Sequence, residues 1–407
     1  MNDEQTSKPK IRFTEYSEVW KLHKLGEIFS ERSERSAEGE LISVTINSGV
    51  VKASELDRKD NSSSDKSNYK IVKKGDIAYN SMRMWQGASG FSPYNGILSP
   101  AYTVISPKEN VNSLFMSYMF KKYDMIQLFK RNSQGLTSDT WNLKFPALST
   151  IKVKIPSVDE QGEIVNLLKK IDDTINLHQE KLDLLKYTKQ VYLQNMFPIS
   201  GEDRPKIRFA GFTDAWKPHK LGEMFENLES GVSVNSSNDN TGYFILKTSA
   251  IKFGEVDLTE VKAIIKNELR RAKTPILKNS IIISRMNTPE LVGASGLTTE
   301  SKDNIFLPDR LWQGEVNKNF SAEWLIQSIN TTFNIKKIHD LATGTSGSMK
   351  NISKKSMLNF DLSAPTLKEQ QKIGSFFKQL GDTITLQQRE LDSLKEMKKS
   401  LLKKMFV

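Results

Sequence analysis

The side chains that most often perform catalysis are scarce in this sequence. It has no cysteine and four histidines: His23, His178, His219 and His339. A disulfide, a thiolate zinc site and a cysteine nucleophile are therefore ruled out, and a histidine-rich metal centre is not expected. The sequence also shows no clear pairing of a nucleophile with a base. These residues predict neither a catalytic site nor a metal site in this chain.

Two segments approach known nucleotide-handling motifs without matching them. Segment 344–350 (GTSGSMK) lacks the GxxxxGK[ST] spacing of a phosphate loop. Segment 287–290 (NTPE) differs at two of four positions from the Asn/Asp-Pro-Pro-aromatic tetrapeptide with which base-amino methyltransferases grip a flipped base. A GxGxxG motif between a strand and a helix is also missing. The sequence therefore shows none of the motifs that mark the common nucleic-acid chemistries.

The charge balance indicates an anionic partner. Of the 407 residues, 59 are Lys or Arg and 48 are Asp or Glu, which gives a formal net charge of +11. Nucleic acid is the commonest partner of such a protein, although a solvated basic surface would give the same balance. The polar N-terminal segment 1–10 and the lack of a long apolar run predict a cytoplasmic protein without a membrane contact.

Arginine and amide side chains gather after two predicted strands. Segment 73–79 predicts a turn followed by a strand, and segment 278–283 is its counterpart. These strands lead into segments 80–86 (NSMRMWQ) and 284–287 (SRMN). Because Arg, Asn and Gln match the hydrogen-bonding edges of guanine and adenine, both segments are candidates for base contact.

Polar, glycine-containing segments also lie near the end of each half, at 135–142 and 344–351. Glycine there allows a close backbone approach to a phosphate, or simply tight packing. Ordinary solvated loops are the alternative interpretation of all these segments. The candidates for DNA contact are Lys73, Lys74, Asn80, Arg83, Gln86, Arg131, Gln134, Thr137, Asn142, Arg285, Asn287, Arg310, Gln313, Ser346, Lys350 and Asn351.

The chain repeats itself. Segment 10–13 (KIRF) recurs at 206–209, and the segment from Trp20 to Glu27 recurs from Trp216 to Glu223. Further on, Pro156 and the pair Glu160-Gln161 recur as Pro365 and Glu369-Gln370, at a longer offset that places a net insertion in the second copy. The interiors 30–134 and 226–343 diverge. A shared framework with different interiors predicts one kind of task performed on two targets. We expect Trp20 and Trp216 to be packing anchors.

Two long heptad runs end the two copies. Segment 159–196 and its repeat predict helices of about 38 residues, on the order of 57 Å long. Antiparallel pairing with each other is the simplest arrangement, with His178 and Gln387 as polar residues that fix the register. A seam that serves only dimerisation is the alternative. The predicted seam consists of Ile164, Leu168, Ile171, Ile175, His178, Leu182, Leu185, Ile373, Phe377, Leu380, Ile384, Gln387, Leu391 and Leu394.

This order of elements predicts an α+β fold with a pseudo-twofold repeat. We expect two tandem α/β recognition domains at 1–155 and 201–364, separated by two long antiparallel coiled-coil helices at 156–200 and 365–407.

The order of variable module, Pro-x-x-x-Glu-Gln heptad helix, second variable module and second such helix resembles the specificity subunit of type I restriction–modification systems. The segments that carry the resemblance are Trp20–Phe29, Pro156–Gln161, their repeats Trp216–Phe225 and Pro365–Gln370, and the heptad runs. The resemblance implies two target recognition domains, each reading one half of a bipartite, asymmetric double-stranded DNA site. It also implies that the helices act as a spacer and dock two modification (methyltransferase) subunits, which restriction (translocase/nuclease) subunits join.

In that family the catalytic subunits are the partners, so the resemblance implies no cofactor in this chain. S-adenosylmethionine, ATP and Mg²⁺ are expected only in the partner subunits. Two other functions remain open from the residues alone. One is a coiled-coil scaffold for proteins whose basic charge is incidental, and the other is a nucleic-acid enzyme with unfamiliar motifs.

Overall fold

The computed structural model describes residues 8–57, 62–199, 201–237, 241–344 and 348–407. Its described residues form two compact units. Unit 1 holds the chain up to Gln179 together with Glu390–Val407, and unit 2 holds Glu180–Arg389. Each boundary falls inside a long helix, so each unit combines one variable module with one end of both helices.

The two predicted long helices are present as α5 (Val158–Asn195) and α9 (Leu367–Lys404), each of 38 residues. Pro156 and Pro365 stand two residues before them, where a helix can begin but cannot extend backward. The predicted boundaries at 155/156 and 364/365 thus fall between a strand and a long helix in both copies.

The ends of the two long helices pack against each other within each unit, and in unit 1 the contacts show their direction. In unit 1, Lys398 Nζ lies 2.5 Å from Asp172 Oδ1, and the His178 ring lies 3.7 Å from Glu390. In unit 2, the ring of Tyr192 packs edge-on against Phe376, with centroids 5.0 Å apart. In unit 1 the contacting residues have rising numbers along α5 and falling numbers along α9, so the two helices are antiparallel there.

Burial along the predicted seam is uneven. Ile175, His178, Leu185, Leu380, Ile384 and Leu394 are only half-buried. The seam positions that are fully buried are Ile164, Leu168, Ile171, Leu182, Ile373, Phe377, Gln387 and Leu391.

Unit 1 is built around an antiparallel sheet of four short strands. Its order is β2 (Phe29–Glu31), β9 (Tyr102–Pro107), β6 (Ile77–Asn80) and β7 (Ser89–Phe91). Three two-stranded sheets accompany it: β1 (Lys21–Lys24) with β10 (Lys152–Ile155), β3 (Ile42–Thr45) with β4 (Gly49–Lys52), and β5 (Lys70–Val72) with β8 (Gly96–Leu98). The turn and strand predicted at 73–79 are confirmed by β6.

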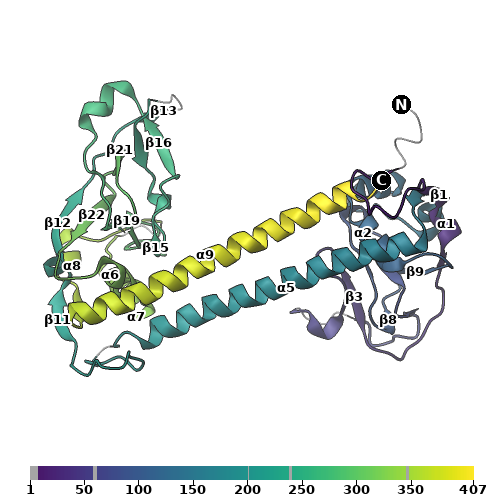
Figure 1. Cartoon of the computed structure of the whole chain (residues 1–407), viewed down its shortest axis with the longest axis horizontal. Coiled ribbons are helices and arrows are strands. Elements are labelled where there is room, and N and C mark those ends of the chain that lie inside the picture. Colours follow the sequence, from purple (N-terminus) through teal and green to yellow (C-terminus); the bar gives the residue numbers. More distant parts are fainter. Residues whose placement is uncertain (1–7, 58–61, 200, 238–240, 345–347) are drawn as a thin grey trace. The chain divides into compact units, whose positions relative to one another are not determined.

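Short helices cover this sheet. They are α1 (Leu25–Ile28), α2 (Ser113–Phe120), α3 (Tyr123–Asn132) and α4 (Phe145–Ser149), with the 3₁₀ turns η2 (Ala53–Glu55) and η3 (Met84–Gln86). The C-terminal end of α9 lies among these elements, next to α2 (Figure 1). Trp20 is 2% exposed in this core and packs against Phe115 and Phe406, so its prediction as a packing anchor is confirmed.

Unit 2 repeats the frame and enlarges the interior. The pair β11 (Lys217–Lys220) and β24 (Asp361–Ala364) corresponds to β1 and β10, with the same antiparallel register. The main sheet has the order β12 (Phe225–Ser230), β22 (Leu311–Val316), β18 (Ser280–Ser284), β20 (Ser295–Leu297) and β15 (Gly254–Glu255). A second five-stranded sheet has the order β13 (Ser236–Ser237), β16 (Val261–Ile264), β14 (Phe244–Leu246), β21 (Lys302–Phe306) and β17 (Pro275–Ile276).

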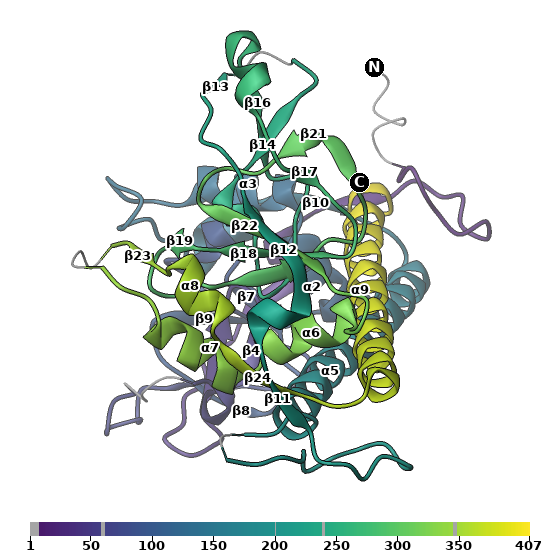
Figure 2. The same ribbon diagram turned by 90° about the vertical axis from the view of Figure 1, so that its left-hand side faces the viewer.

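The helices of unit 2 are α6 (Ala322–Ile329), α7 (Thr332–Asp340) and α8 (Lys354–Leu358), with η4 (Leu221–Met224), η5 (Thr248–Ala250) and η6 (Lys266–Arg271). Figure 2 shows the second sheet on one side of β12, β18 and β22, and α6, α7 and α8 on the other. Trp216 is 3% exposed and packs against Trp324 and Phe197. No helix in the described part of the chain is long and apolar enough to span a bilayer.

Candidate nucleic-acid interface

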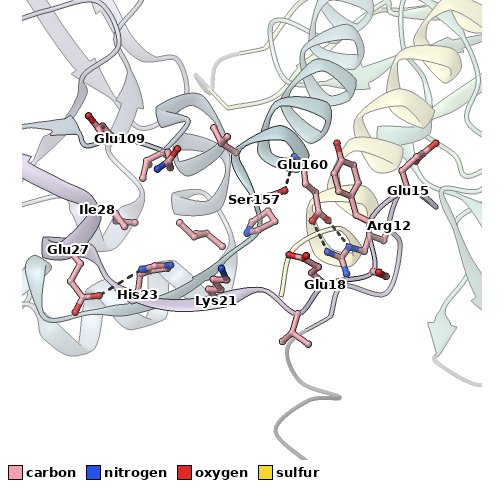
Figure 3. Close-up of a pocket in the computed structure, with 18 residues that line it drawn as sticks. Arg12, Glu15, Glu18, Lys21, His23, Glu27, Ile28, Glu109, Ser157 and Glu160 are labelled. Atoms are coloured by element: carbon pink, nitrogen blue, oxygen red, sulfur yellow. Dashed lines mark hydrogen bonds and ion pairs between the residues drawn. The ribbon is translucent and has the colours of Figure 1, made fainter.

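The repeated KIRF and Glu-Gln motifs meet in a buried ion pair. Arg12 donates from Nε to Glu160 Oε1 at 2.8 Å and from Nη2 to Oε2 at 2.7 Å, and Trp20 Nε1 lies 3.3 Å from the same carboxylate. Glu160 is 1% exposed. Figure 3 shows the pair at the wall of a pocket of about 750 Å³. This clamp holds the start of the chain's described part against the first turn of α5.

Unit 2 repeats the clamp with equivalent residues. Arg208 Nε donates to Glu369 Oε1 at 2.7 Å, and Nη2 donates to Oε2 at 2.8 Å. The hydrogen bond to Glu369 raises the pKa of the Arg208 guanidinium above its ordinary value. Two parallel charge-assisted hydrogen bonds fix orientation as well as distance. The framework shared by the two copies is therefore a structural clamp.

The glutamine of each Glu-Gln pair ties the long helix to its module. Gln161 Oε1 accepts from the backbone N–H of Asn112 at 2.8 Å, and its Nε2 donates to Pro156 O at 3.0 Å. In unit 2, Gln370 makes the same two bonds, to Ser321 N–H and Pro365 O. Asn112 and Ser321 are the N-caps of α2 and α6. Each glutamine thus locks a module helix to the long helix that follows it.

A short hairpin leaves the framework of unit 1 at residues 134–142, the first hairpin. Gln134 N–H donates to Asn142 O at 3.0 Å, and Asn142 N–H donates to Gln134 O at 2.8 Å. Gly135 has φ +150°, and a Cβ there would lie 2.6 Å from Thr140 O. Glycine is therefore required for the loop to close.

Unit 2 has an equivalent second hairpin at residues 343–351. Thr343 and Asn351 exchange backbone hydrogen bonds of 2.8 and 2.9 Å. Gly344 also has φ +150°, and a Cβ there would lie 2.8 Å from Met349 O. The candidate Ser346 lies outside the described residues. The two copies thus share the stem of this loop, although their tip sequences differ.

In both units the hairpin lies against the turn that follows the central strand. Leu143 N–H donates to Ser81 O at 2.8 Å, directly after β6. Ile352 N–H donates to Arg285 O at 2.9 Å, directly after β18. In unit 2 the contact extends into a small sheet between β19 (Met286–Asn287) and β23 (Lys350–Asn351). The structure therefore brings together the two segments that were predicted separately in each copy.

Comparison with known proteins identifies this framework. The family model described as "Type I restriction modification DNA specificity domain" matches residues 17–187 and 213–396. The chain belongs to this family. Each match contains the glutamate of one clamp and one hairpin, so residues 17–187 form the first specificity domain and residues 213–396 the second.

The named relatives of this chain are distant from it in sequence. It is 20% identical over 343 residues to the type I restriction enzyme MjaVIII specificity subunit of Methanocaldococcus jannaschii, covering 82% of this chain and 78% of that one. The EcoKI specificity subunit of Escherichia coli K12 is 24% identical over 316 residues, with coverages of 74% and 67%. The type I S subunit structure from M. genitalium shares the fold, with a TM-score of 0.61, 15% identity and coverages of 98% and 99%.

In the first specificity domain, the candidates Arg83, Arg131, Gln134 and Thr137 are exposed, and Gln86 is partly exposed. Trp141 of the hairpin packs edge-on against Trp85 of the turn, with centroids 5.3 Å apart, and Lys130 Nζ lies 5.4 Å from the Trp141 ring centre. The turn, the hairpin and the end of α3 therefore form one surface.

Four other candidates in this domain are placed differently. Lys73 and Lys74 precede β6, at the opposite end of the strand from the hairpin, and Lys73 Nζ lies 3.2 Å from Glu34. Asn80 Oδ1 accepts from Met82 N–H at 3.0 Å, so this side chain helps to form the turn. Asn142 is half-buried at the base of the hairpin.

In the second specificity domain, Arg310 is exposed, and its carbonyl accepts from Arg285 N–H at 3.0 Å. Lys350 Nζ donates to Gly344 O within the hairpin at 3.1 Å. Asn287 bonds locally to Ser284 and Thr288, and Asn351 is half-buried like Asn142.

Gln313 is a correction to the candidates. It is 3% exposed, its Oε1 accepts from Leu277 N–H at 3.1 Å, and its Nε2 donates to Pro275 O at 2.9 Å. Its amide ties β22 of the main sheet to β17 and the residue after it in the second sheet, and is not available to a base.

Proposed function

We propose that this chain is the non-catalytic DNA-specificity subunit of a type I restriction–modification enzyme, and that each specificity domain reads one half of a bipartite site. The observation that carries the proposal is the pairing of a hairpin with the turn after the central strand, which recurs on an equivalent framework in both units. A repeated framework with different exposed side chains suits two readers of the same kind with different targets.

The difference between the two surfaces supports an asymmetric site. The first surface carries two tryptophans and the exposed Arg83 and Arg131. The second carries Arg310 and Lys350 beside a hairpin of different sequence. Base contacts depend on the pattern of donors, acceptors and apolar groups, so two such surfaces select different half-sites.

The long helices are the proposed docking surface for two modification subunits, which restriction subunits then join. Apolar side chains stand exposed on these helices in both units: Leu177 and Met397 in unit 1 are 64% and 50% exposed, and Leu184 and Tyr187 in unit 2 are both 65% exposed. Exposed apolar side chains that gather on one face, as Leu184 and Tyr187 do three residues apart on α5, mark interaction surfaces. In this proposal the helices also set the spacing of the half-sites.

The chemistry belongs to the partners in this proposal. The modification subunits hold S-adenosylmethionine, the restriction subunits use ATP and Mg²⁺, and this chain supplies binding energy and position. The substrate, double-stranded DNA, implies a location in the cytoplasm.

Methylation mapping tests the proposal. The chain and its cognate modification subunit are expressed together in a host that lacks both, and methylated bases are located by long-read sequencing. We expect one bipartite, asymmetric methylated motif that requires both proteins. A motif that appears with the modification subunit alone, or no motif from a purified complex of the two, would refute it.

A further inference from the structure

We propose that the tip of the first hairpin reads base edges in the major groove of the first half-site, and that Leu136 and Asp139 make the discriminating contacts. This inference rests on the proposed function and narrows it to one loop. Part of the tip of the second hairpin lies outside the described residues, so the proposal concerns the first hairpin.

The tip of the first hairpin is fully exposed to solvent. Every residue from Gln134 to Thr140 is exposed, and Leu136 has an exposed fraction of 102%. A single exposed leucine is common on protein surfaces and is not in itself a site. Here it stands at the end of a hairpin on the same surface as the cations Arg83 and Arg131, where DNA would cover it.

The tip is also held in one shape before any partner binds. Thr140 N–H and Oγ1 both donate to Thr137 O, at 3.0 and 2.9 Å, and Thr137 N–H donates back to Thr140 Oγ1 at 3.2 Å. Gly135 closes the loop at φ +150°, and the packing of Trp141 on Trp85 fixes its base. Preorganisation of this kind reduces the entropy lost on binding and keeps side chains in register with their targets.

The distribution of charge separates base contact from phosphate contact. Segment 135–140 (GLTSDT) contains no Lys or Arg, and its one charged residue is Asp139. The cations lie at the base of the hairpin, at Arg83 in the turn that contacts it and at Arg131 and Lys144 that flank it, all of them exposed. A loop that gripped phosphates would carry cations at its end, because neutralisation of phosphate drives that contact. A carboxylate at the tip is repelled by phosphate and is suited to a groove that presents amino donors.

The chemistry of the tip matches the major groove. That groove is about 12 Å wide and admits a two-stranded ribbon. It displays the N4 amino group of cytosine and the C5-methyl group of thymine. A carboxylate accepts from the amino group, and an aliphatic side chain packs on the methyl group. Asp139 is therefore assigned to an amino-bearing base, and Leu136 to a thymine.

Two tip variants and one flank variant test the assignment in the complete complex with the modification subunit. Asp139→Asn and Leu136→Ala are mapped by whole-genome methylation, as is Arg131→Ala, a matched control for phosphate contact. We expect each tip variant to lose about tenfold of its preference for the native base at one position of the first half-site. The second half-site stays unchanged. Arg131→Ala lowers methylation across all sites and lessens the salt dependence of DNA binding, without a change of motif.

The outcomes separate this inference from the proposed function. If the wild-type complex gives no bipartite motif, the proposed function fails. If the wild-type motif is present and both tip variants keep the same first half-site, the hairpin inference alone fails. A uniform loss of methylation, or a change confined to the second half-site, also overturns it. Because the substituted side chains are exposed, unchanged thermal unfolding is expected and is measured for each variant. Asp139→Ala and Leu136→Met replace any variant that does not fold.

Discussion

Phe406, in the last residues after α9, stacks on Phe115 of α2, with ring centroids 4.9 Å apart and ring planes 21° apart. The core of unit 1 is thus completed by residues from the far end of the sequence. Met196 and Phe197, which follow α5, occupy the equivalent place in the core of unit 2. Each specificity domain therefore needs the helix that arrives from the other one.

This relationship predicts a crossed pattern of destabilisation. Phe406→Ala removes a side chain that is 4% exposed and should lower the stability of unit 1 by about 3–5 kcal/mol. Phe197→Ala should do the same to unit 2. Hydrogen exchange followed by mass spectrometry measures each unit separately. Equal loss of protection in both units from either variant would contradict the assignment of these residues to single cores.

The clamp predicts an unusual double-mutant result. Glu160→Gln leaves the Arg12 guanidinium, whose side chain is 12% exposed, without its charged partner, and should destabilise unit 1 by about 3–5 kcal/mol. Arg12→Met combined with Glu160→Met should recover much of that loss, because no unpaired charge remains. Lys220→Ala, which breaks an exposed pair with Asp361, is the control and should change stability by less than about 1 kcal/mol. Chemical unfolding measures all three, and a double variant no better than Glu160→Gln would count against the clamp.

Gly135 and Gly162 give a matched pair of variants that tests the role of the first hairpin. Gly135→Ala places a Cβ 2.6 Å from Thr140 O at a φ of +150°, so the loop must move. We expect weaker methylation and a relaxed first half-site, with little change in unfolding temperature. Gly162→Ala, in the first turns of α5, meets nothing within 4 Å and should leave the motif intact while stabilising the helix by about 0.5–1 kcal/mol. If both variants behave alike in methylation mapping, the hairpin has no part in recognition.

Lys121 predicts a pH dependence of stability in unit 1. Its Nζ donates to Gly87 O at 2.6 Å and Ile46 O at 2.9 Å, and burial, aided by the charge of Lys398, lowers its pKa from 10.5 to about 8. The unfolded chain therefore binds more protons than the folded chain between these two values. Stability should rise as the pH increases from about 8 toward 10.

Lys121→Met removes the proton that the Lys121 side chain takes up on unfolding. The variant should therefore flatten the rise of stability with pH, whatever its effect on stability at pH 7. Burial raises the pKa of Tyr79 and Tyr118, so their contribution opposes the rise only when the pH approaches the ordinary tyrosine value of 10.0. Burial also lowers the pKa of Lys122, which adds to the rise in both proteins, so the difference between the wild type and Lys121→Met from pH 7 to 9.5 reports Lys121. An equally steep rise in the variant would show that other groups cause it.

Much of the framework was predictable because it rests on local periodicity and repetition. The heptad pattern predicted both long helices to within two residues of their ends. The turn at Gly75 and the apolar residues that follow it predicted β6. Trp20 and Trp216 were identified as anchors because a tryptophan repeated beside Lys-Leu-Gly-Glu favours packing.

The clamp was missed because its partners are 148 residues apart in the sequence. Only the joint recurrence of Arg12 and Glu160 in both copies hinted at a contact. Gln313 was misjudged for a different reason. Residues Leu311–Gly314 of β22 are buried on both faces, so polar alternation did not reveal which side chains point inward. The meeting of the hairpin with the turn after β6 was likewise invisible, since it depends on the tertiary path between them.

The most direct test of the account is a chain that carries the first reader twice. Residues 225–351 are replaced by residues 29–142, which leaves both clamps and both long helices in place. The variant is expressed with the modification subunit, and its methylated motif is mapped. Two independent readers predict a bipartite motif whose two half-sites have become the same sequence, that of the native first half. If the variant still forms a folded complex and methylates the native asymmetric site, the two specificity domains do not read the half-sites independently, and the account is contradicted.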